Sequence, residues 1–105
     1  MSVNNPTLQE TAGAPRGSLV EHFKDRHPGT LHLLKFFEDF DKGPQLVRQI
    51  NHSFHMTAGN LVSVLEDGPE LTAGLRKLLE AKNCFGRQAF EQAHEMQEVL
   101  GAEIV

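Results

Sequence analysis

The chain has little cysteine and only one kind of large aromatic residue. Cys84 is the single cysteine among 105 residues. One thiol cannot close an internal disulfide, and it leaves a cysteine-based zinc site without its other ligands. Tryptophan and tyrosine are absent, so seven phenylalanines are the only large aromatic side chains. Aromatic packing of a core, or stacking on a base, therefore falls to phenylalanine.

An excess of positive charge is also lacking. The chain has 10 Lys and Arg against 14 Asp and Glu, which gives a net charge of -4 with neutral histidine. It contains no run rich in lysine or arginine. Because a protein without a broad positive field does not attract nucleic acid in general, we expect no general nucleic-acid binding. A focused pocket for a small anion is compatible with this charge.

Long apolar runs and a secretion signal are missing as well. No run approaches the roughly 20 apolar residues that a membrane span needs. The opening segment, MSVNNPTLQETAGAPRG, has neither a basic start nor a continuous apolar stretch, and a secretory signal has both. We therefore expect a soluble cytoplasmic protein with no membrane partner.

The motifs of common enzymes and metal sites do not occur. The sequence has no G-x-S-x-G, P-loop or G-x-G-x-x-G motif. Glu66 and Asp67 are paired carboxylates, but a helix cap explains their position. His52 and His55 lie three residues apart, a spacing that can present two imidazoles to one metal, yet zinc needs a third or fourth ligand. We expect a protein that is not an enzyme and that holds no metal or other cofactor.

Regular helical spacing is what the sequence does contain. Apolar residues at intervals of three and four form one stripe over residues 44–66: Val47, Ile50, Phe54, Ala58, Leu61 and Leu65. The turn EDGPE follows, in which Asp67 suits the cap and Pro69 the first turn of a second helix, expected over 69–98. A turn this short makes the two helices antiparallel. The sequence therefore predicts an all-α fold built on an antiparallel helical hairpin.

One or two short helices are expected ahead of the hairpin. Ser18 followed by Glu21 is a capping-box pattern, and Pro28 with the next glycine closes the helix that they begin. Thr30 suits the cap of a second helix, TLHLLKFFEDF.

The sequence also indicates where the folded domain begins and whether it associates. Residues 1–17 have no periodicity and are expected to be a flexible arm, which leaves residues 18–105 as a single helical-hairpin domain. So small a domain has little margin of stability. A two-helix hairpin also exposes apolar surface on the side away from its partner helix. We therefore expect a homo-oligomer.

A lysine interrupts the apolar stripe of the second helix. At 100° per residue, Lys82 falls about 20° from Leu71. One interpretation is that its methylenes cover apolar surface while its amine stays in water. The other is a cation at a subunit seam, where a phosphate would offset the cost of its desolvation. The other basic residues of this helix lie on its sides or back, as solvated charges do: Arg76, Lys77 and Arg87.

A polar row lies beside the apolar stripe of the first helix. It consists of Arg48, His52, His55 and Gly59, which share one face. An anionic ligand could bind this row, because Arg48 is always charged, both histidine rings are polar and Gly59 leaves space. The alternative is that both histidines are ordinary polar-side residues.

A resemblance to a known group covers residues 28–92. It rests on the segment LLKFFEDFDKGPQLVRQINHSFHMTAGNL and on the segment that follows, LVSVLEDGPELTAGLRKLLEAKNCFGRQAF. Together they resemble small helical-hairpin proteins of bacteriophages, especially those of actinobacteria, which share the aromatic-acidic stretch, the Pro-x-Leu helix start and the Asp-Gly-Pro-Glu-like turn. That group is similar to the Acb/Tad hairpin family, phage-encoded sponges that sequester the cyclic nucleotide signals of host CBASS and Thoeris defences.

The resemblance implies an anti-CBASS or anti-Thoeris protein that serves immune evasion in the host cytoplasm. Its homo-oligomer would bind a cyclic dinucleotide, a cyclic trinucleotide or a cyclic ADP-ribose-like messenger without turnover. Burial preference favours core positions for Phe37 and Phe40, whereas the resemblance implies that one of them stacks on a base. It implies phosphate contacts for Arg48, Lys77 or Lys82. Tyrosine and tryptophan are common stacking residues in such sponges, and without tyrosine this chain cannot donate a phenolic hydrogen bond to a ligand.

The alternative function is a helical adaptor whose apolar stripe binds a host or phage protein.

Overall fold

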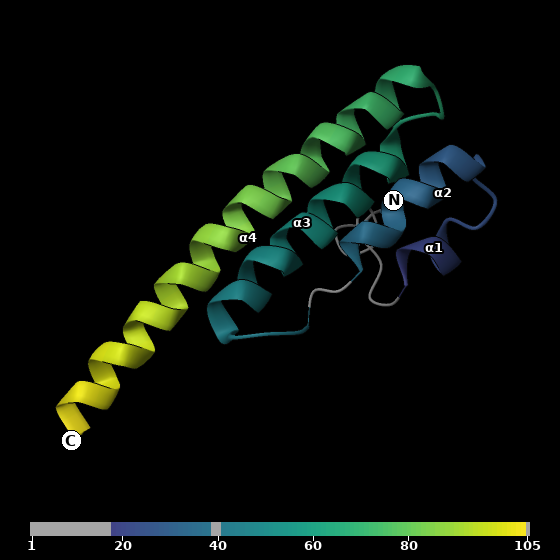
Figure 1. The fold of residues 1–105 in the computed structure, drawn as a ribbon. Coiled ribbons are helices and arrows are strands. Elements are labelled where there is room, and N and C mark those ends of the chain that lie inside the picture. Colours follow the sequence, from purple (N-terminus) through teal and green to yellow (C-terminus); the bar gives the residue numbers. More distant parts are fainter. Residues whose placement is uncertain (1–17, 39–40, 105) are drawn as a thin grey trace, which may run out of the picture.

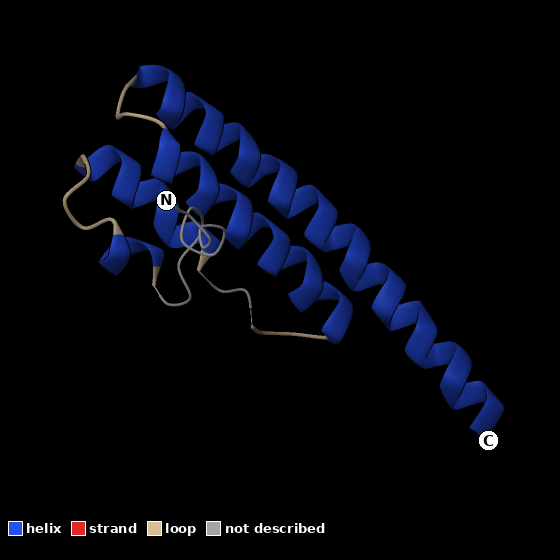
Figure 2. Cartoon of the chain, turned by 180° about the vertical axis from the view of Figure 1, so that it is seen from behind, coloured by secondary structure: helices blue, strands red, loops and turns tan. Residues whose placement is uncertain are grey.

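Two long antiparallel helices form the body of the structure, a computed structural model that describes residues 18–38 and 41–104. Helix α3 spans Gln45–Val64 and helix α4 spans Pro69–Ile104, with a short turn between them (Figure 1). Every regular element in the described ranges is helical (Figure 2). The all-α helical hairpin predicted from the apolar spacing is therefore confirmed.

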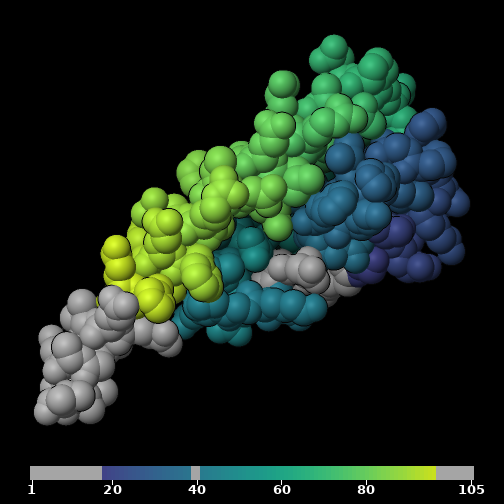
Figure 3. Space-filling model, in the orientation of Figure 1, coloured from purple at the N-terminus to yellow at the C-terminus, as the bar shows by residue number. Residues whose placement is uncertain are grey.

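Three short elements precede the hairpin. They are α1 (Leu19–His22), α2 (Pro28–Leu34) and the 3-10 helix η2 (Lys35–Phe37). Helix α2 packs against α4, and η2 packs against α3. Figure 3 shows α2, in blue, lying against the green part of α4. The short helices thus cover one side of the hairpin near its turn. The predicted flexible arm, residues 1–17, lies outside the described residues.

The two arms of the hairpin differ in length. Helix α3 has 20 residues and α4 has 36. At the rise of an α-helix, α3 is about 30 Å long and α4 about 54 Å long. The end of α4 therefore extends past the start of α3, as the yellow part of Figure 1 shows. Within the described residues, neither arm nor any shorter helix is long and apolar enough to cross a membrane.

The hydrophobic core lies near the turn, where the short helices cover the hairpin. Leu34 and Phe37 of the short helices are fully buried, together with Val62 of α3. Leu75 of α4 is also almost completely buried. Burying a large apolar side chain stabilises a protein by about 1.5–3 kcal/mol. These contacts hold the short helices on the turn end of the hairpin.

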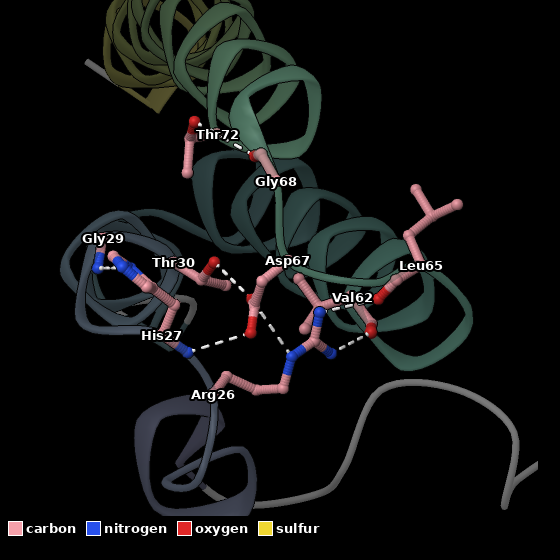
Figure 4. A network of polar contacts seen from close by, with 9 residues as sticks. All are labelled: Arg26, His27, Gly29, Thr30, Val62, Leu65, Asp67, Gly68 and Thr72. Carbon is pink, nitrogen blue, oxygen red and sulfur yellow. Dashed lines mark hydrogen bonds and ion pairs between the residues drawn. The ribbon is translucent and has the colours of Figure 1, made fainter.

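A polar network joins the short helices to the turn (Figure 4). The carboxylate of Asp67 accepts hydrogen bonds from Arg26 Nε at 3.2 Å, from the His27 backbone N–H at 3.0 Å and from Thr30 Oγ1 at 2.7 Å. The Arg26 guanidinium also donates to the carbonyl oxygens of Val62 and Leu65. Carbonyls at the end of a helix lack helical partners, and they favour a nearby cation. One arginine and one aspartate therefore connect the α1–α2 link to the end of α3.

Two of the caps predicted from the sequence are wrong. Thr30 is the third residue of α2, and the cap is His27, whose Nδ1 accepts a hydrogen bond from the Gly29 N–H at 2.9 Å. The sequence places Asp67 as the cap of α4, whereas its carboxylate bonds to the segment before α2 and to Thr30. The Ser18 cap is confirmed, because its Oγ accepts from the backbone N–H three residues on at 3.1 Å.

The Asp67 network makes stability depend on pH. The hydroxyl of Thr30, followed by Arg26 and the His27 N–H, lowers the pKa of Asp67 from 3.8 to about 2. A carboxyl whose pKa is lowered by folding stabilises the protein above its unfolded pKa, and this stabilisation is lost as pH falls through the folded value. We expect the free energy of unfolding of the parent protein to fall between about pH 4 and pH 2. Asp67→Asn should start from a lower value at pH 7 and show a shallower fall. Urea unfolding followed by circular dichroism measures both, and parallel pH profiles would contradict the role of Asp67.

Candidate functional site

Two residues predicted to bind ligand lie in the core. Phe37 is 0% exposed and His55 is 1% exposed. The Nδ1 atom of His55 lies 2.9 Å from the carbonyl oxygen of Phe37, which joins α3 to η2. Side chains buried this deeply present no surface to a ligand, so both act in packing in this structure. Phe40, the other predicted stacking residue, lies outside the described residues.

The polar row on α3 is only partly at the surface. Arg48 and His52 are exposed, whereas His55 and Gly59 are buried. The rings of His52 and His55 are stacked, with centroids 6.3 Å apart and an interplanar angle of 15°. Because Gly59 is buried, it is part of the packing and offers no gap to an anion.

Lys82 lies half-buried between the two arms and lines a groove. The groove has a volume of about 480 Å³. Small-molecule sites have volumes of about 300–1,000 Å³, so this volume suits a small ligand. We call it the Lys82 groove. Its lining comes from α3 and α4: Val47, Asn51, Lys82, Asn83, Gly86, Arg87, Phe90 and Glu91.

The Lys82 groove lies on the side of the hairpin that carries α2. Thr72 marks this side, because a Cβ on Gly29 of α2 would lie 3.9 Å from Thr72 Cγ2. Phe90 follows Thr72 by 18 residues, which is about five full turns of helix. The two residues therefore share one side of α4. Helix α2 packs beside the two arms near their turn. The Lys82 groove lies on the same side, farther from the turn.

Gly86 of α4 lines the groove opposite Asn51 of α3. A Cβ on Gly86 would lie 3.9 Å from Oδ1 of Asn51, across the gap between the arms. Lys82 precedes Gly86 by one helical turn and lies on the same side of α4. A residue larger than glycine here would narrow the space that Lys82 and Asn51 line.

Positive charge exceeds negative charge in the groove. Its charged residues are Lys82, Arg87 and Glu91. Within the described residues, no hydrogen bond or ion pair reaches the amine of Lys82. Arg87 Nη2 donates to Cys84 Sγ at 3.6 Å, a weak contact that leaves its other N–H groups for a ligand. Since two cations and one carboxylate line the groove, its net charge favours an anion.

Lys77 lies on another side of α4. It lines a second groove, whose other residues are mostly apolar. Lys77 and Lys82 therefore line different grooves, which have no residue in common. Arg48 lines neither groove. The structure therefore does not bring together Arg48, Lys77 and Lys82, the alternatives that the resemblance implied for phosphate contacts.

Sequence reasoning missed Arg87 and Phe90. It placed Arg87 among the solvated charges and gave Phe90 no role. The signal that finds Phe90 is spacing, because Gly86 and Phe90 follow Lys82 at successive intervals of four residues and so share its side of the helix. Arg87 adjoins that row.

The residues of the groove are suited to binding. Lys82 and Arg87 are phosphate donors, and the amides of Asn51 and Asn83 can bond the edge of a base. Phe90 is 56% exposed and presents an aromatic ring. Among the described residues, no three His, Cys, Asp or Glu side chains are placed to hold a metal ion.

Comparisons with known proteins give no family for this chain. No protein-family model matches it, and neither the curated proteins nor the solved structures include a significant match. The residues of the Lys82 groove are therefore the basis for a functional proposal.

Proposed function

We propose that the protein binds a cyclic nucleotide in the Lys82 groove and holds it without turnover. In a phage-infected cell this capture would withdraw an immune messenger from the host cytoplasm, as an anti-CBASS or anti-Thoeris sponge does. The observation that carries the proposal is that Lys82 is a half-buried residue of the groove and that, within the described residues, no hydrogen bond or ion pair reaches its amine. The proposed functional unit is a homo-oligomer, because so small a chain gains stability by association.

The proposed phosphate contacts come from two cations on neighbouring turns of α4. Lys82 as a residue is half-buried in the groove before any ligand binds. A phosphate would then form charge-assisted hydrogen bonds with it, which are stronger than neutral ones. Arg87, five residues on, adds a planar donor that suits phosphate oxygens. Glu91 in the same groove repels a second negative group, which favours one phosphate at this position.

The proposed base contact comes from Phe90. Its exposed ring lines the same groove as Lys82. Stacking a base on an aromatic side chain contributes about 1–3 kcal/mol. Phe90 thus takes the stacking role that the resemblance implied for Phe37 or Phe40, since Phe37 is in the core. Asn51 and Asn83 are suited to hydrogen bonds with the edge of that base.

Replacing Lys82 tests the phosphate contact. Lys82→Met keeps most of the stem and removes the charge, so it should fold as well as the parent protein. We expect it to bind a cyclic dinucleotide, a cyclic trinucleotide or cyclic ADP-ribose at least tenfold more weakly, about 1.4 kcal/mol, whichever of the three the parent binds. Isothermal titration calorimetry measures this.

The control for Lys82→Met is Lys24→Met, which removes the same charge from an exposed residue outside the groove. It should bind as the parent does. Unchanged binding by Lys82→Met would clear Lys82 of a ligand role, and Arg48 and Lys77 would be the next cations to test.

Replacing Phe90 tests the stacking contact. Phe90→Ala removes an exposed ring, so we expect little change in the melting temperature and a loss of affinity of about tenfold. The control is Phe36→Ala, which removes another exposed ring outside the Lys82 groove. If both variants bind with parental affinity, the base does not stack on Phe90.

A helical adaptor is the second candidate function. It is favoured by exposed apolar residues on the hairpin, among them Leu61 at 39%, Leu65 at 48% and Phe85 at 57% exposed. Apolar faces of helices also serve protein partners. The calorimetry with cyclic nucleotides separates the two functions, because an adaptor would release or absorb no heat of binding with any of them.

A further inference from the structure

We infer that a second copy of the chain docks on the apolar groove beside Gly74 and forms a four-helix dimer with the first. This groove is the one that Lys77 lines, and we call it the Gly74 groove. It has a volume of about 690 Å³. The inference does not rest on the proposed ligand binding, because the two grooves have no residue in common. The Gly74 groove is lined by Leu61, Leu65, Glu66, Gly68, Pro69, Glu70, Leu71, Gly74, Lys77, Leu78 and Ala81.

The Gly74 groove lies on the side of the hairpin turned away from α2. Ala81 lines it, and Phe90 of the Lys82 groove follows nine residues later. Nine residues turn an α-helix by about 900°, which is two and a half turns. The two residues therefore lie on opposite sides of α4. Since Phe90 shares the side on which α2 packs, the short helices do not cover the Gly74 groove.

The apolar residues of this side are contiguous and come from both arms. Leu61 and Leu65 are 39% and 48% exposed, at the end of α3. Leu78 and Ala81 face the same groove from α4 and are only partly buried. Single exposed apolar residues are common on protein surfaces. A contiguous apolar groove is instead typical of an interaction surface.

Gly74 has no function within a single chain that the structure reveals. It stands inside α4, and a Cβ there would have nothing within 4 Å. Glycine in the interior of a helix costs about 0.5–1 kcal/mol relative to alanine, and neither its backbone nor a neighbouring side chain requires it here. A glycine at an exposed position does allow the backbone of another helix to come close.

Charge around Gly74 points to a second copy as the occupant. Glu70 lies four residues before Gly74 and Lys77 lies three residues after it, and both line the groove. If two α4 helices cross antiparallel at Gly74, a two-fold axis places Glu70 of one copy within a residue of Lys77 of the other. The same surface is then complementary to itself, as a two-fold dimer requires. An antiparallel crossing also brings the apolar residues beside each glycine together.

The mass of the full chain in solution tests the dimer. We expect light scattering after gel filtration to give twice the chain mass of 11.7 kDa for the parent protein. Gly74→Arg should give the monomer mass with an unchanged helical circular dichroism signal, because the space around its Cβ is open within the chain. The matched control is Ser63→Arg, which places the same side chain at an exposed position outside the groove and should stay dimeric.

A charge exchange tests the two-fold arrangement without placing bulk in the groove. Glu70→Lys should raise the dimer dissociation constant at least tenfold, because it sets lysine against lysine across the interface. The double variant with Lys77→Glu should return it to near the parental value. The inference would be overturned by any one of four results. The parent protein could be monomeric at all concentrations, or its mass could exceed that of two chains. Gly74→Arg could stay dimeric, or Glu70→Lys could keep the parental dissociation constant. Ligand binding by a monomeric Gly74→Arg would leave ligand capture in the Lys82 groove intact, since the two grooves are separate, and would remove only the homo-oligomer as its functional unit.

Discussion

The carboxylate of Asp67 is the interaction on which the arrangement of this small protein depends. It lies in the turn between the two arms and accepts hydrogen bonds from the link before α2 and from Thr30 within α2. Its partner Arg26 closes the end of α3 through two carbonyls. These bonds fix α2 on one side of the hairpin, at its turn end. Both candidate surfaces follow from that position, because the Lys82 groove lies beyond α2 and, among the described elements, the short helices do not cover the opposite side of the hairpin.

Much of the fold could be predicted from the sequence because its signals are local. The three-and-four spacing of apolar residues defines α3, and Pro69 marks the start of α4. The Asp67 network could not be predicted, since Thr30 and Arg26 lie 37 and 41 residues away in the chain. An aspartate ahead of a proline has the local pattern of a helix cap, and only tertiary contact gives it a different partner. Thr30 was misplaced for the same reason.

The candidate site could be predicted only in part. Lys82 was found because a charge inside an apolar stripe is visible in the sequence alone. The burial of Phe37 agrees with its burial preference and not with the stacking role that the resemblance implies. The burial of His55 could not be predicted, because it depends on how η2 packs on α3, which the helical pattern of neither segment reveals. Arg87 and Phe90 line the groove with Asn51 of α3, which lies opposite Gly86 of α4. Which residue of α3 faces Gly86 depends on how the two arms are aligned along each other, and the spacing of apolar residues within one helix does not specify that alignment.

The two grooves lie on opposite sides of α4, one proposed to bind a ligand and the other a second copy of the chain. One is lined by two cations, a carboxylate and an aromatic ring, and the other is mostly apolar with three charged residues in its lining. The most direct measurement of where ligand binds is the amide spectrum of the isotope-labelled protein, titrated with whichever cyclic nucleotide binds in calorimetry. We expect shifts concentrated at Asn51, Asn83 and Arg87, with little change at Ala81. Shifts confined to the Gly74 groove, or no shift with any cyclic nucleotide, would contradict ligand binding in the Lys82 groove.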